Sequence, residues 1–352
     1  METNLKDGVI LASGVTKWLL HKFTDINKGR MNEHILVMQK NTGKSKAQIY
    51  LALLISFLTR GTGYTDFFRG NFLEISSKEK DTFVTAKSFY KILAYLNDPS
   101  YTMVIEDKLI FNELYKNYLG RSFINLRVAG SEDFKAFIKN KTNVFAKDPV
   151  GYGGHGVKKI KVSEIENADT LYNELKKQGL FLLEEEIIQH KELDKINPNV
   201  VNSFRIITLY KDGEAHIINN ALRVNQGEDN VIGCTKDLYF SLGEDGRIDS
   251  NVIDDLGNVY TTHPLTGISF DEIKIPFVKE AFDICKTAAK KIPQVRYIGW
   301  DIAFSENGPV LVEGNEYPGY GLLQHYKLKN KRTGHLKEIA DVLGDEMKNI
   351  KI

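Results

Sequence analysis

Residues 297–315 read YIGWDIAFSENGPVLVEGN and predict the β-hairpin on which the fold assignment depends. The runs IGWDIAF and PVLVEG alternate in the manner of strands, and the Ser-Glu-Asn-Gly between them is a turn signal. A type I turn that ends on a left-handed glycine makes a three-residue loop. In that register Ser305 faces Pro309 and Ile302 faces Val312. The predicted hairpin therefore has one wholly apolar face.

The other face of this hairpin carries three oxygen-bearing side chains. Asp301 faces Glu313, and Asn315 lies two residues further along the same face. Two carboxylates directly opposite each other repel unless a cation or a proton lies between them. Ligands that are all oxygen suit a hard cation, so we expect Mg2+ or Mn2+ here. A solvated acidic face is the alternative, and a two-residue turn would shift the register by one and break the cluster.

The composition is that of an ordinary globular protein. The chain has 352 residues, of which 42% are hydrophobic and 26% charged, and its formal net charge of +1 gives no reason to expect nucleic acid as a partner. Its two cysteines, Cys234 and Cys285, lie far apart, which fits a reducing compartment and favours the cytoplasm. The N-terminus lacks the pattern of a secretory signal. The most apolar run, 49–58, is about half the length of a bilayer crossing and predicts a buried helix.

The spacing of apolar residues changes near residue 100. Residues 1–100 show the three-and-four spacing of helices, whereas 101–330 alternate short strands with helices and indicate an α+β body. Within that body, 101–190 contains a glycine-rich loop, and 191–330 contains longer antiparallel strands and the hairpin. The last residues, 331–352, predict a C-terminal helix.

The glycine-rich loop, GYGGHG, occupies residues 151–156. Its spacing matches a dinucleotide-binding fingerprint, but that fold requires a helix after the glycines, and the residues that follow here alternate like a strand. We therefore predict a flap between two strands, in which Gly153, Gly154 and Gly156 let backbone N–H groups approach phosphate oxygens. Lys147, at the end of the incoming strand, would add an ammonium group. A purely structural turn is the alternative.

An apolar strand breaks into three glutamates in FLLEEEIIQHKEL, residues 181–193. Exposed backbone here would hydrogen-bond an adenine edge while aliphatic side chains sandwich the ring. Glu192 would accept hydrogen bonds from ribose hydroxyls. The residues that we assign to this nucleotide hinge are Glu184, Glu185, Ile187, Ile188 and Glu192. The alternative is a run of solvated acids at a strand end.

Two arginines lie on predicted strands with apolar neighbours. Arg205 is in VNSFRIITLY and Arg223 is in NNALRVNQGEDN. A guanidinium in such a place needs an anion to offset the cost of its burial. A bound phosphate would serve, and a structural salt bridge to one of the nearby acids is the alternative.

Taken in chain order, these segments resemble the ATP-grasp superfamily. The set begins with Lys108 in EDKLIF and continues through the flap, the hinge, the two arginines and the hairpin. Within the superfamily, NSFRIITL, THPLTG, IGWDIAF and VLVEGNEYPG closely resemble the sugar-transfer-associated ATP-grasp family, which is found with polysaccharide biosynthesis genes. The resemblance covers roughly 95–330. Two departures are Ser203, where threonine is expected, and Cys234, where glycine is more usual.

This resemblance implies an α+β fold of the ATP-grasp type, in which two α+β subdomains clasp ATP and a helical region precedes them. Lys108 and Lys147 would hold the α and β phosphates. The three hairpin side chains would hold one or two Mg2+ ions that bridge the β and γ phosphates. Arg205 and Arg223 would face the transferring phosphoryl group.

The resemblance also implies a carbon-nitrogen ligase that releases ADP. A substrate carboxylate would attack the γ-phosphate to give an acyl phosphate, and an amine would then displace phosphate. The product would be a sugar or polysaccharide precursor, such as one for a capsule, that carries an amino acid or amine. We expect no nucleic acid partner and no transmembrane segment.

Two other functions stay open at this point. A phosphotransferase acting on a sugar hydroxyl would use the same ATP site and would need a base, for which His190, His216 or His263 are candidates. A non-catalytic nucleotide-binding component of a glycan assembly complex is the other, and the intact set of hairpin ligands argues against it.

Overall fold

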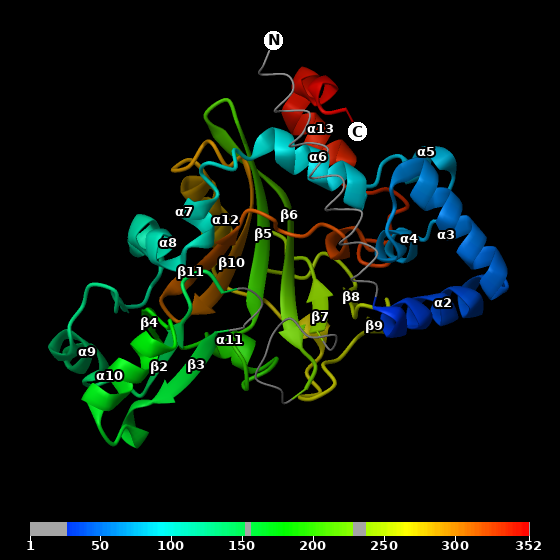
Figure 1. Ribbon diagram of the computed structural model, residues 1–352. Coiled ribbons are helices and arrows are strands. Elements are labelled where there is room, and N and C mark those ends of the chain that lie inside the picture. Colours follow the sequence, from blue (N-terminus) through cyan, green and yellow to red (C-terminus); the bar gives the residue numbers. More distant parts are fainter. Residues whose placement is uncertain (1–26, 152–155, 228–236, 352) are drawn as a thin grey trace, which may run out of the picture.

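Two antiparallel sheets organise the part of the chain that the computed structural model describes, which is residues 27–151, 156–227 and 237–351 (Figure 1). The smaller sheet has the strand order β1-β4-β2-β3, and the larger has the order β11-β10-β5-β6-β7-β8-β9. The smaller sheet contains β1 (Phe123–Asn125), β2 (Asn143–Lys147), β3 (Val157–Lys161) and β4 (Leu182–Glu185). The larger contains β5 (Ser203–Lys211), β6 (Glu214–Asn225), β7 (Asp237–Phe240), β8 (Val252–Ile253), β9 (Val259–Tyr260), β10 (Tyr297–Ser305) and β11 (Gly308–Asn315).

The helices form two groups: the first precedes the strands in the chain, and the second is mostly interspersed among them. The first group is α2 (Lys28–Thr42), α3 (Lys46–Arg60), α4 (Tyr64–Arg69), α5 (Ser77–Lys80) and α6 (Ala86–Leu96). The remaining helices are α7 (Met103–Glu106), α8 (Lys108–Tyr115), α9 (Ser131–Ile138), α10 (Ala168–Lys177), α11 (Lys191–Asp194), α12 (Val278–Ala289) and α13 (Leu336–Leu343). The helical N-terminal region and the mixed body behind it have the α+β composition that the sequence predicts.

Helix α3 is not the buried helix that its apolar sequence predicts. It lies at the edge of the molecule in Figure 1, and Leu51, Leu54 and Leu58 are 59%, 52% and 72% exposed. Only Ile49 and Ser56 of this helix are buried. The sequence-based expectation was wrong because the helix is apolar nearly all round, and within the described residues its neighbours α2 and α4 cover only one side. None of the helices in the described parts is long and apolar enough to cross a membrane.

Strand β10 is the most deeply buried part of the hairpin. It lies between β11 and β5 and is buried along almost its whole length. Trp300 is fully buried there, and its indole Nε1 donates to Thr208 Oγ1 of β5 at 2.8 Å. Helix α12 packs against this sheet and contributes Phe282 and Cys285 to its core. Cys285 is a buried free cysteine, whereas Cys234 lies outside the described residues.

The smaller sheet has its own core beneath α9 and α10. Buried Phe134, Val144 and Leu175 belong to it. The N-cap of α9 is Gly130, whose N–H donates to the carboxylate of Asp133 at 2.9 Å. Ser131 is the first helical residue, and its hydroxyl donates to Asp169. This sheet is therefore a separately packed α+β unit.

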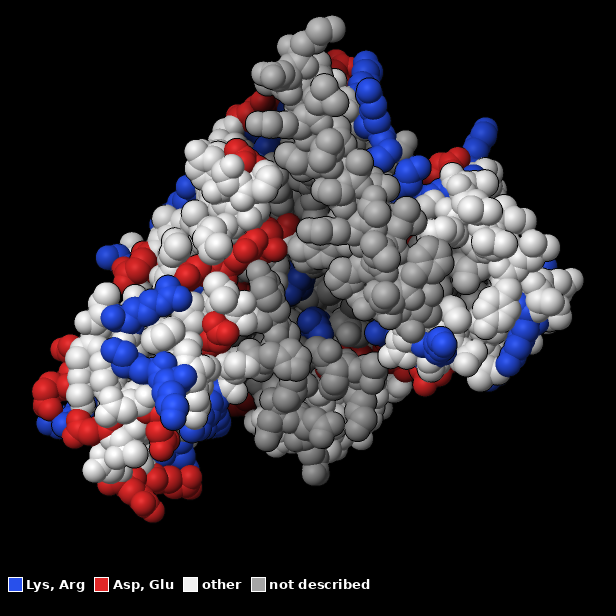
Figure 2. Space-filling model, in the orientation of Figure 1, with Lys and Arg blue, Asp and Glu red and all other residues white. Residues whose placement is uncertain are grey.

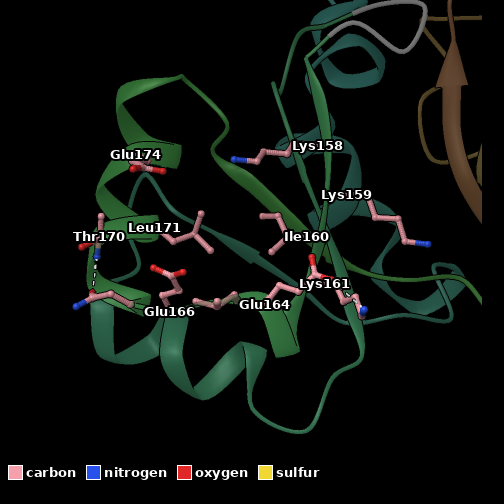
Figure 3. Close-up of a pocket in the computed structure, with 11 residues that line it drawn as sticks. Lys158, Lys159, Ile160, Lys161, Glu164, Glu166, Thr170, Leu171 and Glu174 are labelled. Carbon is pink, nitrogen blue, oxygen red and sulfur yellow. Dashed lines mark hydrogen bonds and ion pairs between the residues drawn. The ribbon is translucent and has the colours of Figure 1, made fainter.

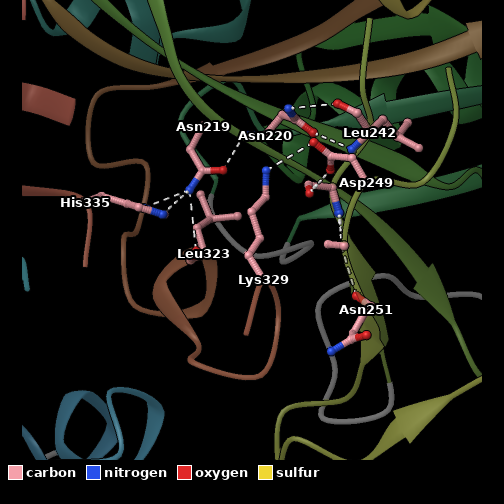
Figure 4. Close-up of polar contacts among 10 residues, drawn as sticks. Asn219, Asn220, Leu242, Asp249, Asn251, Leu323, Lys329 and His335 are labelled. Atoms are coloured by element: carbon pink, nitrogen blue, oxygen red, sulfur yellow. Dashed lines mark hydrogen bonds and ion pairs between the residues drawn. The ribbon is translucent and has the colours of Figure 1, made fainter. Parts of the chain in front are cut away.

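A network of polar contacts ties the chain after the hairpin to the larger sheet (Figure 4). Asn219 of β6 lies 2.8 Å from the Nδ1 atom of His335, and Asn220 donates to the carbonyl of Leu242 at 3.2 Å. Asn251 donates to the carbonyl of Lys327 at 2.7 Å. The contact of Asn251 fixes the segment around residue 327 next to the residues that precede β8.

Candidate active site

The hairpin of β10 and β11 closes with a two-residue turn, so the predicted three-residue loop was wrong. Ser305 pairs with Gly308, and Ile302 pairs with Leu311. The Ser305 hydroxyl accepts from the N–H of Asn307 at 3.2 Å and donates to the Gly308 carbonyl at 3.0 Å, which favours the shorter turn. Leu311 consequently points into the core rather than onto the acidic face.

A β-bulge restores the predicted pairing at the functional end of the hairpin. The register shifts between Asp301 and Ile302, which leaves Val312 as the extra residue of β11. Beyond the bulge Asp301 pairs with Glu313. The facing carboxylates that the sequence predicts are therefore present, although the turn that led to them was assigned incorrectly.

Arg205 of β5 pairs with Asp301 from the other side. Its Nε donates to Asp301 Oδ1 at 2.5 Å, a terminal nitrogen donates to Oδ2 at 2.9 Å, and the other donates to the carbonyl of Pro318 at 2.7 Å. This is the geometry of the ion-pair alternative, so the contact of Arg205 with a phosphoryl group stays a prediction. The bidentate pair holds the Asp301 carboxylate in a fixed orientation.

The two carboxylates of the hairpin titrate in opposite directions. Burial raises the pKa of Glu313, and the charge of Asp301 raises it further. Burial also acts to raise the pKa of Asp301, but Arg205 outweighs it and the net shift is downward. The charged Asp301 carboxylate therefore favours either a proton on Glu313 or a cation between the two carboxylates.

The hairpin fits a Mg2+ ion that a nucleotide helps to bind. Within the described residues no three His, Cys, Asp or Glu side chains converge on one point. The hairpin itself offers Asp301, Glu313 and the amide of Asn315, whose buried nitrogen has no hydrogen-bond partner among the described atoms. Mg2+ typically takes one or two protein carboxylates and completes its shell with water and phosphate oxygens.

Two predicted phosphate-binding lysines lie where the smaller sheet faces the hairpin. Lys108 donates to the carbonyl of Gly151 at 2.5 Å, at the start of the glycine loop. Burial lowers its pKa, while the charge of Glu313 raises it. Lys147, the last residue of β2, lies 2.5 Å from a carboxylate oxygen of Glu184. Lys108 thus lies within electrostatic range of Glu313 on one side and of Lys147 on the other.

Glu184 is a buried anchor for cations, which is a different environment from the open hinge that the sequence predicts. Its carboxylate accepts from Arg121 at 2.6 Å and from Asn112 at 2.8 Å, in addition to Lys147. Burial acts to raise the pKa of Glu184, but the charges of Lys147 and Arg121 outweigh it and hold the pKa at about 2. Arg121 also donates to the carbonyl of Leu311 at 2.9 Å and so joins β4 to β11.

The other side chains that we assign to the hinge are partly or largely exposed to solvent. Glu185 is bonded to Ser122 at 2.6 Å, Ile187 is half-buried, and Ile188 is 67% exposed. Glu192 is paired with Lys195 at 2.8 Å. A contact of these residues with adenine or ribose stays a prediction.

The glycine-rich segment lies between two strands, as the sequence predicts. Strands β2 and β3 are antiparallel and Lys147 pairs with Val157. Gly156 has a φ of +72°, and a Cβ there would lie 2.9 Å from Asp148, so this position favours glycine. Gly153 and Gly154 lie outside the described residues.

Arg223 stands on the larger sheet with two partners that the sequence analysis did not identify. It lies 2.9 Å from the buried carboxylate of Asp237 and 5.6 Å from the ring centroid of Tyr239. Both residues belong to β7, where Tyr239 pairs directly with Arg223. The run DLYF carries these residues with no motif around it, so only the strand pairing reveals them.

The three candidate histidine bases do not gather at the hairpin carboxylates. His263 is 1% exposed and its Nε2 lies 3.0 Å from the carbonyl of Asn225. His190 caps α11 and lies 3.4 Å from Glu306, while His216 is on the exposed part of β6. A separate groove of about 500 Å3 between β3 and α10 contains none of the predicted site residues (Figure 3).

The geometry and the sequence comparison agree on the class of protein. A fold with two α+β units, a glycine flap and an acidic hairpin is that of the ATP-grasp proteins. The model of the family described as sugar-transfer associated ATP-grasp matches residues 90–333, and the chain belongs to that family. ATP and Mg2+ are the cofactors that fit it, and no curated protein sequence matches the chain.

Solved structures of ATP-grasp and related ligases are similar to this chain at low identity. The ATP-grasp ligase PsnB complexed with minimal precursor has 17% identity and a TM-score of 0.42, covering 70% of this chain and 62% of that one. D-alanyl-alanine synthetase A from Vibrio cholerae has 11% and 0.38, with coverages of 70% and 63%. An L-amino acid ligase from Bacillus licheniformis has 12% and 0.39, with coverages of 66% and 46%. The chain thus spans less than two thirds of each of these proteins.

Proposed function

We propose that this protein is an ATP- and Mg2+-dependent ligase that joins a carboxylate to an amine. The observation that supports the proposal is the pairing of Asp301 with Glu313 beside Arg205, with Lys108 within electrostatic range of Glu313 and of Lys147. A site that opposes two carboxylates to two lysines suits a triphosphate with a divalent cation between them.

The side chains of this chain would divide the work by position. Lys108 and Lys147 would bind the α and β phosphates, while Asp301, Glu313 and Asn315 would hold the cation. Bound Mg2+ would neutralise charge on the β and γ phosphates. Arg205 would orient Asp301, and Arg223 would offer its guanidinium to the transferring phosphoryl group. The substrate carboxylate would attack in line, so no side-chain nucleophile is required.

The substrate that we propose is a sugar or polysaccharide precursor, and the family description, sugar-transfer associated, supports it. An amino acid or another amine would be joined to it through an acyl phosphate. We also propose a cytoplasmic location, where ATP is available, and a functional division into 1–100, 101–190, 191–330 and 331–352.

An ADP and phosphate release assay tests the reaction. The protein is incubated with Mg2+, ATP, a uronic acid and each amino acid in turn, and Glu313→Gln is the inactive control. Equal amounts of ADP and phosphate, with hydroxylamine trapping a hydroxamate of the acid, support ligation. ADP without phosphate, together with a phosphorylated sugar, would show a phosphotransferase instead. Absence of any Mg2+-dependent ATP binding would exclude both enzymes.

A further inference from the structure

A second charged cluster lies between the N-terminal helices and the larger sheet. Arg30 of α2 and Arg69 of α4 each donate to a different carboxylate oxygen of Asp255, with Arg69 at 2.5 Å. Asp255 follows β8 and is only 6% exposed. His34 lies 3.9 Å from the same carboxylate, and His325 is buried nearby. We call these five residues the Asp255 cluster.

The Asp255 cluster has more positive than negative charge. Two guanidiniums share one carboxylate, and both histidines stay neutral because burial lowers the pKa of His34 and lowers that of His325 to about 3. A structural ion pair would be balanced, since an uncompensated buried charge is costly. Asp66, a buried carboxylate one turn before Arg69 on α4, offsets part of the charge of Arg69, so the excess that favours an additional anion lies on the side of Arg30.

Several nitrogen atoms of the cluster are buried and lack a hydrogen-bond partner among the described residues. They are the Nε atoms of Arg30 and Arg69, both ring nitrogens of His34, and Nε2 of His325. Buried polar atoms of this kind are rarely left unpaired in a native protein, and the two arginine Nε–H groups are donors that an anion could satisfy. The side chains of Arg30 and Arg69 are nevertheless 31% and 15% exposed, so a solute can reach them.

A row of paired residues connects this cluster to the candidate active site. Arg223 pairs with Tyr239, and Tyr239 pairs with Ile253 on β8, two residues before Asp255. Arg223 and Arg69 both act to lower the pKa of Tyr239 against the effect of burial, so the phenol lies within electrostatic range of both arginines. Figure 2 shows Lys or Arg atoms on the face that lies between the N-terminal helices and the smaller sheet.

The surroundings of Glu184, which we call the Glu184 centre, have the same ratio of two cations to one carboxylate. They lie next to the lysines for which we predict phosphate binding. There, Lys147 and Arg121 share the single carboxylate of Glu184. One buried acid would hold two cations in place, and the remaining positive charge would be available to a ligand. The Asp255 cluster repeats this arrangement with two arginines, whose forked donors suit a carboxylate or a phosphate.

We propose that the Asp255 cluster binds an anionic group of the sugar substrate, a carboxylate or a phosphate other than the carboxylate that reacts, and directs the rest of that substrate along Tyr239 toward Arg223. This inference rests on the proposed function, because it assigns a substrate site to the same reaction centre. It makes the helical N-terminal region a part of the substrate site.

The test measures binding of two anionic sugars to the full chain without nucleotide. Calorimetric titrations use glucuronate for the carboxylate, glucose 1-phosphate for the phosphate, and glucose as the neutral control. Arg30→Gln is the main variant because its side chain is partly exposed, and Arg69→Gln is the second. Arg60→Gln is the matched control, since Arg60 forms an exposed ion pair with Asp81 in the same helical region.

We expect at least one anionic sugar to bind the unmodified protein and glucose not to bind. Arg30→Gln should weaken that binding by about tenfold or more, as for loss of a hydrogen bond between charged groups, while Arg60→Gln should not change it. The affinity for ATP with Mg2+ should be the same in the unmodified protein and in all three variants. Once a reaction is established, the KM for the acidic substrate should rise in Arg30→Gln with the KM for ATP unchanged.

The outcomes separate this inference from the proposed function. Binding that depends on Arg30 in a protein that releases no ADP would support the anion site and contradict the ligase. Failure of both anionic sugars to bind, or equal binding by folded Arg30→Gln and Arg69→Gln proteins, would overturn the anion site even if the ligase assay succeeds. Which of the two sugars binds identifies the anionic group.

Discussion

The hairpin site and the Asp255 cluster are built from the same two residue types in opposite proportions. At the hairpin, Asp301 faces Glu313, and Arg205 is bonded to Asp301 alone. In the cluster, Arg30 and Arg69 share Asp255. Among the residues in direct contact, the first arrangement has two acids for one arginine and fits a cation, whereas the second has two arginines for one acid and fits an anion. The proportion of acid to arginine, rather than the presence of an ion pair, thus distinguishes the ligands that the two sites suit.

Strand pairing places these two sites at opposite ends of one surface. The larger sheet carries Arg205 on β5, Arg223 on β6 and Tyr239 on β7, in neighbouring strands. Asp255 follows the next strand, β8. A substrate held by its anionic group at the cluster could therefore extend across the sheet to a phosphoryl group at the hairpin.

The largest effect that we expect is the loss of turnover in Glu313→Gln. The amide keeps the shape of the side chain but removes the charge that would bind Mg2+, so ADP release should fall below detection. The melting temperature of the protein without ligands should stay unchanged or rise, because the substitution removes one of two facing like charges. Release of ADP and calorimetry measure the two effects.

Glu306→Gln is the control for this substitution. Glu306 lies in the turn of the same hairpin and contacts His190 rather than the carboxylate pair. It should retain turnover. Full activity of Glu313→Gln at saturating Mg2+ would remove the hairpin from the mechanism and with it the contrast between the two sites.

Loss of either central carboxylate should destabilise the protein strongly. Asp301→Asn leaves Arg205, and Asp255→Asn leaves Arg69 and the partly exposed Arg30, without their acid, and loss of one partner of a buried ion pair costs about 3–5 kcal/mol. The two variants should respond differently to ions. Inorganic phosphate should raise the melting temperature of Asp255→Asn more than that of the unmodified protein, because binding stabilises the folded state, and it should not do so for Asp301→Asn.

Asp81→Asn provides the scale for this comparison. Its carboxylate is 60% exposed in the ion pair with Arg60, and such pairs contribute about 1 kcal/mol or less. Chemical unfolding with and without phosphate measures all four proteins. Equal responses of Asp301→Asn and Asp255→Asn to phosphate would mean that the two sites do not differ in the sign of their surplus charge.

The sequence predicts the two sites to very different extents. Strand alternation brings Asp301 opposite Glu313, and the glycine loop and Lys147 follow from local patterns. The turn was assigned wrongly, because neither the hydrogen bonds of Ser305 nor the bulge at Val312 has a sequence signal strong enough to fix the register. The pairing was nevertheless correct, since the bulge compensates for the shorter turn.

The Asp255 cluster has no local pattern at all. Its members come from two helices, the loop after β8 and the segment after β11, and they meet only through tertiary packing. Glu184 illustrates the same limit within a motif that the sequence does reveal. The run of three glutamates predicts exposed acids, but the strand alternation of β4 turns only Glu184 inward onto Arg121 and Lys147.

Lys147→Ala should weaken ATP binding by about 1–3 kcal/mol, which is the range for a hydrogen bond to a charged group. The structure adds that Glu184 loses one of its cations, so some loss of stability should accompany the change. Titration of ATP with Mg2+ into the folded variant measures the affinity. Lys159→Ala is the control, because Lys159 is exposed on β3 and pairs with Glu186. An unchanged ATP affinity in Lys147→Ala would show that the surplus charge at Glu184 is not used for phosphate.

The smallest effect that we expect is the loss of stability at low pH. It tests whether Glu184 and Asp255, which each contact two cations, respond to protonation in the same way. The pKa of Glu184 is lowered from its ordinary value of 4.5 to about 2, and that of Asp255 lies below its ordinary value of 3.8. A lowered pKa in the folded state means that the contribution to stability is complete above the ordinary value and is lost as the pH falls toward the shifted one. Between about pH 7 and pH 4 the Glu184 contribution should shrink by about 1 kcal/mol, whereas that of Asp255 should change less because its ordinary pKa is lower.

Urea unfolding of the unmodified protein, Glu184→Gln and Asp255→Asn at several pH values measures this, since the difference in the free energy of unfolding between protein and variant isolates each group. A difference for Glu184→Gln that stays constant or grows on acidification would mean that Lys147 and Arg121 do not hold this carboxylate in its charged form, and the parallel between the Glu184 centre and the Asp255 cluster would fail.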